Sequence, residues 1–591
     1  MRDSNNAMLH PYANIACLTR LAAALLALGI AAANAQTAAP APEAATGRIV
    51  KNAETTKLDM VAAANPLAAK AGKDILAAGG SAVDAAIAVQ LVLALVEPQS
   101  SGLGGGALLV HFDGKEMATL DGRETAPAAA IPERFLWADG KPVEFYAAVI
   151  GGRSVGVPGT PRLLEEAHKK WGKLPWAKLF EPAISVAENG FNMSPRLVGL
   201  IAKDRFLSRD PNAKALYFNE DGAPKTVGTL LKNPAMAATL RLLAQNGMDA
   251  FYTGDIAQDI VDTVTKHPAN PGDMTLDDLK GYKAIARAAV CGPYRGRKVC
   301  GMGPPSSGAV AVLQTLSVLE GQNMAAMPRG PEAAHWMAEA ERLAFADRAQ
   351  YLADPDFVAV PVEGLLDAQY LETRAALVDP AKSMGTAKAG EPPRKKAQGF
   401  APSDGIEFGT SHISIIDRFG NAVSMTTTIE DGFGARLMTK SGFLLNNELT
   451  DFSFVPMKDG LPVANRVEPG KRPRSSMAPT IVLDENGKLL AVVGSPGGSL
   501  IINFVVKALV ALIDWRLDPQ VAVDLPNFGS RNGPTELETG TEAEGWKPAL
   551  EAKGHLVKLI EMTSGIQAIL VTKNGFTGGA DSRREGVAIG N

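Results

Sequence analysis

Apolar and polar positions alternate differently in the two halves of the chain. Residues 60–96 are almost continuously apolar and are interrupted by Gly79-Gly80, which predicts a helical region broken in two. Residues 107–112 and 117–121 flank Asp113-Gly114 and predict a strand pair. A mostly helical region is expected from about 160 to 380.

The last third of the chain is rich in predicted strands. These fall at 410–417, 421–429, 478–484, 488–494 and 566–573, with a helix predicted at 500–515. Residues 383–405 carry Pro, Gly, Lys and Ser without an apolar period and are expected to form a mobile loop or linker. Helical runs beside glycine-punctuated strands predict a layered α/β fold with its sheets inside.

The run SGLGGG at residues 101–106 invites comparison with a phosphate-binding loop. It precedes a predicted strand, whereas a dinucleotide fingerprint follows a strand and opens a helix. No GK[ST] sequence accompanies it. We interpret these glycines as a turn in which main chains approach closely.

The N-terminal residues resemble an export signal. Arg20 precedes the apolar run 21–35, which ends in the small-x-small sequence Ala33-Asn34-Ala35. We therefore predict a signal peptide at 1–35, a disordered linker at 36–46, and an exported protein with the periplasm as its compartment. The run is short for a membrane span, so no stable span is expected, although an uncleaved anchor remains the alternative.

Charge and composition narrow the function classes. The chain has 59 Lys and Arg against 63 Asp and Glu, a balance that offers no basic field for a nucleic-acid partner. After signal removal Cys291 and Cys300 remain, either as a disulfide or as two reduced thiols on adjacent strands. Two cysteines and seven histidines without HxxxH spacing make a poor metal site, and no metal or cofactor is predicted.

The stretch IEFGTSHISII, residues 406–416, contains the candidate nucleophile. If the hairpin turns at Phe419, with Gly420 at positive φ, Thr410 faces Thr428 within about one residue of register. A threonine hydroxyl needs an adjacent base, and no Ser-His-Asp arrangement is visible. The α-amine of Thr410 itself, with a pKa of roughly 8, becomes that base if the Gly409–Thr410 bond is cut. Thr410 could instead be an ordinary strand opener, and His412 is interpreted as structural.

Several motifs occur in an order that resembles the γ-glutamyltransferases. They are DGRETAP at 121–127, PPSSGA at 304–309, GTSHISIIDRFGNAVS at 409–424, SGFLLNNELTDFS at 441–453, KRPRSSMAPT at 471–480 and GSPGGS at 494–499. The resemblance implies an N-terminal-nucleophile (Ntn) hydrolase with a four-layer αββα sandwich. It also implies a precursor that cuts itself into two intertwined subunits, residues 47–409 and 410–591.

The resemblance also assigns catalytic roles. Thr410 would attack the γ-amide carbonyl and form an acyl-enzyme, and Thr428 would orient it. The backbone N–H groups of Gly497 and Gly498 would form the oxyanion hole, because glycine lets the main chain come close. Without this context the two glycines would be interpreted as a tight turn.

Substrate-binding roles follow in the same way. Arg123, Ser475 and Ser476 would hold the α-carboxylate of a glutamyl group, while Glu448 and Asp451 would hold its α-ammonium. Taken alone, these residues are equally consistent with a surface ion pair, a loop bonded to its own backbone, and polar residues at a strand end.

The chain departs from the family pattern near this site. Glu430 stands where well-studied members have Asn near the α-carboxylate, and a carboxylate there is expected to repel that group unless it is protonated or turned away. On that basis Glu430→Asn should bind γ-glutamyl donors more tightly. Thr450 replaces an Asp, and a short segment between Asp451 and Ser475 predicts a reduced lid over an exposed pocket.

Three functions are weighed. The first is γ-glutamyl transfer or hydrolysis on glutathione-like compounds, with water or an amino acid as acceptor. The second is a related acylase cutting another amide, such as a glutaryl or cephalosporin side chain. The third is a non-catalytic binding protein on the same fold, which would remain one full-length chain.

Overall fold

The computed structural model describes residue 45 and residues 47–393, 400–403 and 409–591. The predicted signal peptide and nearly all of the predicted linker lie outside these residues. The chain divides into two compact units, Met1–Ala41 and Pro42–Asn591, and all of the described residues belong to the second unit.

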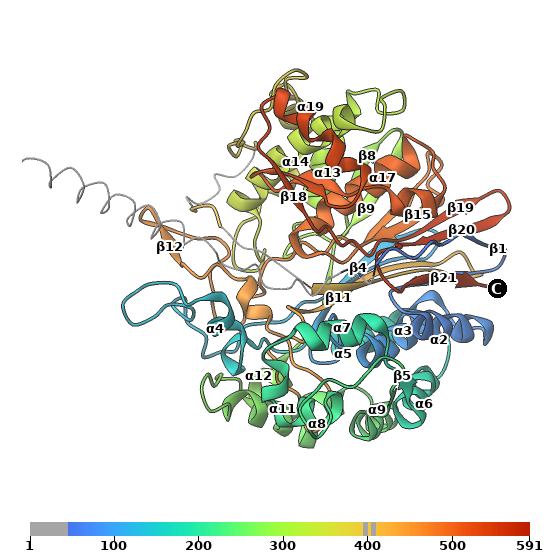
Figure 1. Ribbon diagram of the computed structural model, residues 1–591, viewed down its shortest axis with the longest axis vertical. Coiled ribbons are helices and arrows are strands. Elements are labelled where there is room, and N and C mark those ends of the chain that lie inside the picture. The colour runs from blue at the N-terminus through green and yellow to red at the C-terminus, as the bar shows by residue number, and fades with distance from the viewer. Residues whose placement is uncertain (1–44, 46, 394–399, 404–408) are drawn as a thin grey trace, which may run out of the picture. The chain divides into compact units, whose positions relative to one another are not determined.

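Two seven-stranded sheets form the centre of this unit (Figure 1). One has the order β1 (Glu54–Thr56), β20 (Gly575–Ala580), β19 (Gln567–Thr572), β15 (Leu489–Gly494), β14 (Thr480–Leu483), β9 (Arg297–Gly301) and β8 (Val290–Tyr294). The other has the order β21 (Val587–Gly590), β2 (Met60–Ala63), β10 (Gly409–Ile416), β11 (Ala422–Glu430), β3 (Gly106–Phe112), β4 (Met117–Gly122) and β7 (Ile285–Arg287). Neighbouring strands within both sheets are antiparallel.

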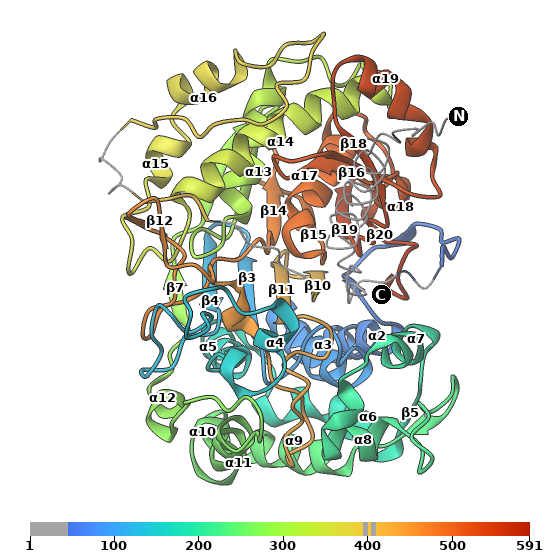
Figure 2. The same cartoon turned by 60° about the vertical axis from the view of Figure 1, so that its left-hand side comes forward.

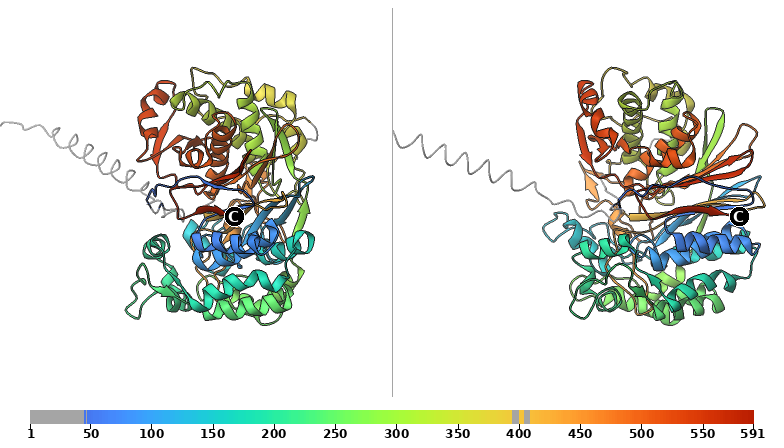
Figure 3. Two further views of the ribbon diagram at one scale, coloured as in Figure 1. Left: turned by 90° about the vertical axis from the view of Figure 1, so that its right-hand side faces the viewer. Right: turned by 45° about the vertical axis from the view of Figure 1, so that its right-hand side comes forward.

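Helices cover the outer face of each sheet, which confirms the four-layer αββα sandwich (Figure 3). Against the second sheet lie α2 (Pro66–Ala77), α3 (Ala82–Val96) and α5 (Thr160–Trp171), and α6 (Glu181–Asn189) packs on α3. Against the first lie α13 (Gly308–Glu320) and α17 (Ile501–Ile513), and α14 (Pro331–Tyr351) packs on α13. The strand faces that meet between the sheets contribute residues such as Leu108, Val110, Ile481 and Val492 to one apolar core.

The remaining elements surround this sandwich. Further helices are α4 (Phe145–Val149), α7 (Pro195–Lys203), α8 (Pro211–Tyr217), α9 (Pro234–Asn246), α10 (Asp249–Tyr252), α11 (Gly254–Thr265), α12 (Leu276–Gly281), α15 (Val362–Leu365), α16 (Ala368–Ala375), α18 (Pro519–Asp524) and α19 (Lys547–Ala552). Short strands are β5 (Phe191–Asn192), β6 (Leu230–Leu231), β12 (Met457–Lys458), β13 (Leu461–Pro462), β16 (Phe528–Ser530), β17 (Thr535–Glu538) and β18 (Val557–Ile560). Among the described residues, no helix is both long enough and apolar enough to cross a membrane.

The predicted strands of the last third are confirmed, and so is the helix that lies among them. Residues 410–416 and 422–429 lie in β10 and β11, which pair at the centre of their sheet and are buried along their whole length. The hairpin turns between Asp417 and Asn421, with Gly420 at a φ of 86° as expected. Figure 2 shows this hairpin between α3 on one side and the strands β14 and β15 on the other.

Two helical expectations were wrong in part. Residues 60–63 form β2, because they pair with β10 and β21, and the helix α2 begins only after the Asn65 cap. The helical region 160–380 is interrupted by β7, β8 and β9. These strands are short. β7 pairs with the distant β4 and β9 with the distant β14, which a local pattern does not reveal, whereas β8 and β9 form a local hairpin.

In its described residues, the segment 383–405 is held by hydrogen bonds to the rest of the protein, although its composition predicted a mobile loop. Residues 383–393 have no helix or strand, but the main chain of Gly390 donates to Asp347 and the Ser383 hydroxyl donates to Glu339. Residues 394–399 and 404–408 lie outside the described part of the chain.

The glycines of SGLGGG are required by close main-chain contacts, as expected. A Cβ on Gly104 would lie 2.1 Å from the Leu444 carbonyl oxygen, and one on Gly105 would lie 2.0 Å from that of Thr428.

The structure also decides between the two states of the cysteines. Cys291 and Cys300 face each other on β8 and β9 and form a disulfide.

Candidate active site

Thr410 lies at the start of β10, in the middle of the sandwich. It is 3% exposed, and its bond to Gly409 is intact. The Thr410 hydroxyl donates to the Gly409 carbonyl oxygen. The Thr428 hydroxyl, on the neighbouring strand, donates to the same oxygen at 2.6 Å. Two hydroxyl groups therefore converge on the carbonyl of the bond that was expected to break.

The hairpin register agrees with the expectation along most of the strand. Ser411 pairs with Thr427 and Ile413 with Met425, but the register shifts next to Thr410, so that Gly409 faces Glu430. This irregularity lets Thr428 reach the Gly409 carbonyl. Thr428 therefore contacts the carbonyl oxygen of the bond at which cleavage was predicted.

A narrow pocket opens at Thr410. It brings together most of the residues singled out in the sequence: Arg123, Gly409, Thr410, Thr428, Glu430, Glu448, Asp451, Ser475 and Gly498, with Met477 and Ile501 completing the wall. The pocket residues Thr410, Glu430 and Arg123 are 3%, 2% and 1% exposed. The exposed pocket expected from the short lid segment is therefore not found while the chain is uncleaved, and that segment forms the hairpin of β12 and β13.

Arg123 occupies the centre of a buried ion-pair cluster. Its guanidinium donates to the carboxylates of Glu448 and Asp451, and also to the carbonyl oxygens of Pro473 at 3.2 Å and Arg474 at 3.0 Å. One arginine thus holds both the acidic segment 448–451 and the chain that leads into Ser475. This places a cation next to carboxylates at one end of the pocket, as binding of an α-amino acid group requires.

Glu430 belongs to the acidic side of this cluster. Burial, together with the neighbouring charges of Asp451, Asp431 and Glu448, raises the pKa of Glu430 well above its ordinary value. Burial also raises the pKa of Glu448. Oε1 of Glu430 and Oε2 of Glu448 accept no hydrogen bond from any described residue. Buried acceptors without a donor are costly, so both carboxyl groups are suited to receive a ligand N–H group.

The backbone of Glu430 is also unusual. Its φ is 75°, a left-handed conformation that side chains other than Gly and Asn seldom adopt. The Thr428 hydroxyl accepts its N–H at 2.8 Å, and the amide of Asn447 donates to its carboxyl group. The position is therefore held by two contacts that aim the Glu430 side chain into the pocket.

The two serines of KRPRSSMAPT are placed differently. Ser475 lines the pocket, and its hydroxyl accepts the N–H of Met477 at 3.1 Å. The Ser476 hydroxyl accepts from the Arg348 guanidinium at 2.7 Å and does not line the pocket. The motif PPSSGA supports this loop, because the Ser307 hydroxyl donates to the Ser475 carbonyl at 2.8 Å.

Gly497 and Gly498 form the turn between β15 and α17, with φ values of 137° and 55°. Both values lie in the region that glycine adopts without strain. A Cβ on Gly497 would lie 2.5 Å from the ring of Phe504. Gly498 lines the pocket beside Thr410, which suits a main-chain oxyanion hole at this position.

Three site residues were missed from the sequence. Glu124 is buried behind Arg123, and burial raises its pKa to about 7. Asn447 donates to the Glu430 carboxyl group and to the Thr450 hydroxyl. Thr450, the residue that replaces an Asp of the family pattern, therefore belongs to the same hydrogen-bond network. Arg348 positions the loop of Ser475 and Ser476. Glu124 and Asn447 lie within two of the sequence motifs, but only the tertiary contacts reveal the role of all three residues.

Among the described residues, a single group of His and acidic side chains converges as metal ligands could: His335, Glu339 and His555. His335 Nε2 lies 2.8 Å from the Asp379 carbonyl oxygen and therefore donates, so that His335 Nδ1 accepts from His555 Nε2 at 2.7 Å. Burial lowers the pKa of both imidazoles. Neutral tautomers thus satisfy the pair, which links α14 to the segment before β18.

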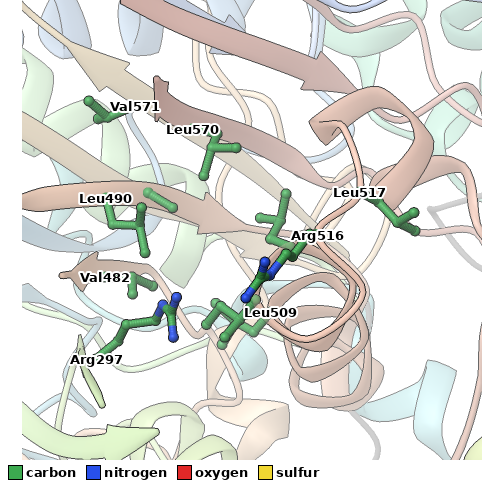
Figure 4. A pocket seen from close by; sticks show the side chains of 11 residues that line it. Arg297, Val482, Leu490, Leu509, Arg516, Leu517, Leu570 and Val571 are labelled. Atoms are coloured by element: carbon green, nitrogen blue, oxygen red, sulfur yellow. The ribbon is translucent and has the colours of Figure 1, made fainter. Parts of the chain in front are cut away.

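A larger pocket lies away from Thr410, between the end of α17 and the strands β9, β14, β15 and β19 of the first sheet (Figure 4). Its volume is about 220 Å³, against about 10 Å³ for the pocket at Thr410. Leucine, isoleucine and valine side chains line it, with Arg297 and Arg516 as the charged residues. It contains no nucleophile or carboxylate, so size alone does not identify the reaction site.

The αββα sandwich, with a threonine at the second position of a central strand and glycines at a turn that borders the same pocket, defines an Ntn hydrolase. The chain belongs to the gamma-glutamyltranspeptidase family, whose model matches residues 68–591. It is therefore an enzyme of this family, and the third of the weighed functions, a non-catalytic binding protein, is not supported.

The chain is similar over its length to characterised relatives. It is 38% identical over 589 residues to a glutathione hydrolase proenzyme of Bacillus subtilis (strain 168), covering 97% of this chain and 98% of the relative. It is 35% identical to an acylase ACY 1 proenzyme of Pseudomonas sp. (strain V22), covering 93% and 96%. A cephalosporin acylase from Bacillus halodurans has a similar structure, with a TM-score of 0.81, 28% identity and coverage of 92% and 98%.

Proposed function

We propose that this protein is an autoprocessing γ-glutamyl hydrolase and transferase that acts on glutathione-like compounds. The observation that carries the proposal is the group of buried carboxyl side chains that line the Thr410 pocket, Glu430, Glu448 and Asp451, among which Glu430 Oε1 accepts no hydrogen bond from any described residue. An α-ammonium group supplies hydrogen-bond donors, and a γ-glutamyl acyl group carries one. The names of the glutathione hydrolase relatives agree with this substrate class.

Maturation begins at the Gly409–Thr410 bond. The Thr410 Oγ attacks the Gly409 carbonyl carbon, and the donated hydrogen bond from Thr428 stabilises the charge that develops on the carbonyl oxygen. An ester between Gly409 and Thr410 Oγ forms as the amide bond breaks, and water then hydrolyses it. The products are a large subunit of residues 47–409 and a small subunit of residues 410–591, which remain together as a heterodimer.

Catalysis then uses the new N-terminus. The α-amine of Thr410 accepts the hydroxyl proton as Oγ attacks the γ-amide carbonyl, and the N–H groups of Gly497 and Gly498 stabilise the oxyanion. The leaving amine takes the proton as the acyl-enzyme forms. Water or an amino acid attacks the acyl-enzyme in turn and releases glutamate or a γ-glutamyl product.

Substrate orientation follows from the charges around the pocket. Arg123, together with Ser475, holds the α-carboxylate, and Glu430, Glu448 and Asp451 surround the α-ammonium. This arrangement exchanges the ion pairs that Arg123 now makes with Glu448 and Asp451 for ion pairs with the substrate. Ser476, for which the same role was expected, instead supports the Ser475 loop through its contact with Arg348. No cofactor or metal takes part in these steps.

A second candidate is an acylase for glutaryl or cephalosporin-type amides. Its support is the similarity to the Bacillus halodurans cephalosporin acylase and to the Pseudomonas acylase. The two candidates differ at one feature of the substrate, since a glutaryl group has no α-ammonium. We place γ-glutamyl first because a glutaryl group would leave the buried Glu430 Oε1 without a donor.

The nucleophile is tested by Thr410→Ala. The wild-type protein should give two bands on a denaturing gel, the smaller one beginning at Thr410 by N-terminal sequencing. The variant should remain one chain without activity, because it lacks the attacking hydroxyl. Cleavage of the variant at the same bond would refute the assignment of Thr410.

The substrate class is tested by comparing γ-glutamyl-p-nitroanilide with glutaryl-p-nitroanilide on the matured enzyme. We expect the γ-glutamyl compound to have the higher kcat/KM. Turnover of the glutaryl compound at an equal or higher kcat/KM would favour the acylase instead.

A further inference from the structure

Arg584 reaches the proposed nucleophile from the last segment of the chain. Its side chain is fully buried, at 0% exposure, and its guanidinium donates to the carbonyl oxygen of Thr410 at 3.2 Å. The contact ties residue 584 to residue 410 across the sandwich, although the two residues are 174 positions apart. A permanent positive charge therefore lies next to the main chain of the nucleophile.

The surrounding chain is shaped to admit this side chain. Gly565 passes so close that a Cβ there would lie 2.7 Å from Arg584 Cδ and 2.7 Å from Pro496 Cγ. Pro496 precedes the proposed oxyanion glycines, so Arg584 lies between the nucleophile strand and the loop that carries them. A side chain larger than hydrogen at position 565 would displace the guanidinium from Thr410.

Charged groups from several elements face Arg584. Glu97, at the end of α3, interacts electrostatically with both Arg584 and Arg196 of α7. Glu585 is the next residue of its own segment, and its carboxylate accepts the N–H of Arg196 at 3.0 Å. Lys51 donates to the Arg584 carbonyl oxygen at 2.8 Å. Burial raises the pKa of Glu97, so this carboxyl neutralises the guanidinium less than an ordinary carboxylate would.

We propose that Arg584 is a positioning residue that fixes the main chain of Thr410 and keeps its α-amine unprotonated at neutral pH after cleavage. The proposal rests on the proposed function, in which that amine is the base. The role of Arg584 goes beyond that function, because it identifies the group that lowers the pKa of the Thr410 α-amine.

The direction follows from the charges. Arg584 keeps its positive charge at every relevant pH, and its contact with the Thr410 carbonyl holds that charge within one residue of the α-amine. A nearby like charge disfavours the protonated amine and therefore lowers its pKa. The carboxyl groups of Glu430, Glu448 and Asp451 line the same pocket and oppose this effect to the extent that they are ionised, which the raised pKa values of Glu430 and Glu448 reduce. An ordinary N-terminal amine has a pKa of roughly 8, so most of it would be protonated at pH 7 and unable to accept the Thr410 proton.

The wild-type enzyme provides the first test. The acid limb of kcat/KM for γ-glutamyl-p-nitroanilide should have its midpoint about 1 pH unit below the pKa of roughly 8 expected for a free α-amine. A midpoint at 8 or above would overturn the proposal while leaving the γ-glutamyl activity itself intact. An inactive wild type would instead overturn the proposed function, so the two failures are distinguishable.

Two variants then separate charge from structure. Arg584→Gln should move the acid limb up by about 1 pH unit, and Arg584→Lys, which retains the charge, should keep it near the wild-type midpoint. If Arg584→Gln stays uncleaved, Arg584→Lys and the wild type still decide the question, because a Lys variant with a midpoint at 8 would overturn the proposal. Equal midpoints in the wild type and Arg584→Gln would do the same.

Arg342→Gln is the matched control. Arg342 is an arginine of similar burial, 1% exposed, whose guanidinium donates to the Gly385 carbonyl and the Thr535 hydroxyl, remote from the pocket. Its replacement should lower the Tm without moving the acid limb. A shift of the limb in this control equal to that in Arg584→Gln would show that any loss of a buried arginine has the effect, and would overturn the specific role.

Discussion

Glu430→Gln tests how the pocket recognises its substrate. The substitution keeps the size of the side chain and an oxygen that can accept from Asn447, and it removes the negative charge. The sequence led us to expect that a carboxylate here would repel the substrate α-carboxylate and that its removal would help binding. We now expect the opposite sign, because Glu430 lies with Glu448, Asp451 and Asp431 and so on the side proposed for the α-ammonium.

The magnitude can be worked from these contacts. A hydrogen bond to a charged group contributes about 1.5–3 kcal/mol, which corresponds to roughly 10- to 150-fold in kcat/KM. Because the pKa of Glu430 is raised, less of this carboxyl group is ionised in mildly acidic solution than of an ordinary Glu, and an ammonium binds best to the ionised form. The loss should therefore lie near the lower end of this range in mildly acidic solution and increase as the pH rises.

The assay is kcat/KM for γ-glutamyl-p-nitroanilide and glutaryl-p-nitroanilide with each enzyme. Glu430→Gln should lower the first value and leave the second nearly unchanged, because a glutaryl group has no ammonium to lose. Glu341→Gln is the matched control, since Glu341 is also buried with a raised pKa but accepts the N–H of Ser530 away from the pocket. Equal losses for both substrates, or tighter γ-glutamyl binding by Glu430→Gln, would refute this reasoning.

Three further outcomes concern stability and folding. Burial raises the pKa of Glu341 to about 8, so between its unfolded pKa and 8 the folded state binds more protons and the stability of the wild type falls as the pH rises. In thermal melts, the Tm of Glu341→Gln should therefore increase relative to that of the wild type from pH 5 to pH 8. A Tm difference that stays constant over this range would contradict the prediction. Cys291→Ser opens the disulfide across a short hairpin and should cost about 2–3 kcal/mol in denaturant unfolding, a loss that reductant should reproduce in the wild type. Gly105→Ala would place a Cβ 2.0 Å from the Thr428 carbonyl oxygen and should prevent cleavage of the chain. In the control Gly281→Ala the added Cβ meets nothing within 4 Å, so this variant should be cleaved into two bands on a denaturing gel. Cleavage of both variants would refute the steric argument.

The central hairpin was predictable because its information is local. Alternation in β10 and β11 and a positive-φ glycine at the turn set the register, and the register brought Thr428 to the neighbourhood of Thr410. The shift of one residue next to Thr410 was not predictable. It decides which oxygen Thr428 contacts, and it depends on the chains packed around the strand end.

The acidic side of the pocket shows the opposite case. The sequence indicated that Glu430 departs from the family pattern and predicted repulsion of the substrate α-carboxylate, whereas the carboxyl neighbours of Glu430 favour a role beside the α-ammonium. Which charge a side chain meets depends on the path of the chain after β11, where Asn447 and a positive φ direct the carboxyl group. Arg584 was not noticed at all, because its partner is 174 residues away.

The sequence by itself determined the class of fold, the candidate cleavage bond and the set of residues around it. These follow from short-range patterns: alternation, glycine placement and the order of motifs. Only the tertiary structure showed that the two cysteines form a disulfide, that residues 60–63 form a strand, that His335 and His555 form a neutral pair, and which carboxyl groups surround Glu430. These features depend on contacts between segments that are distant in the sequence and on burial, which changes the charge of a group. Neither the contacts nor the burial can be predicted from the neighbouring residues in the sequence.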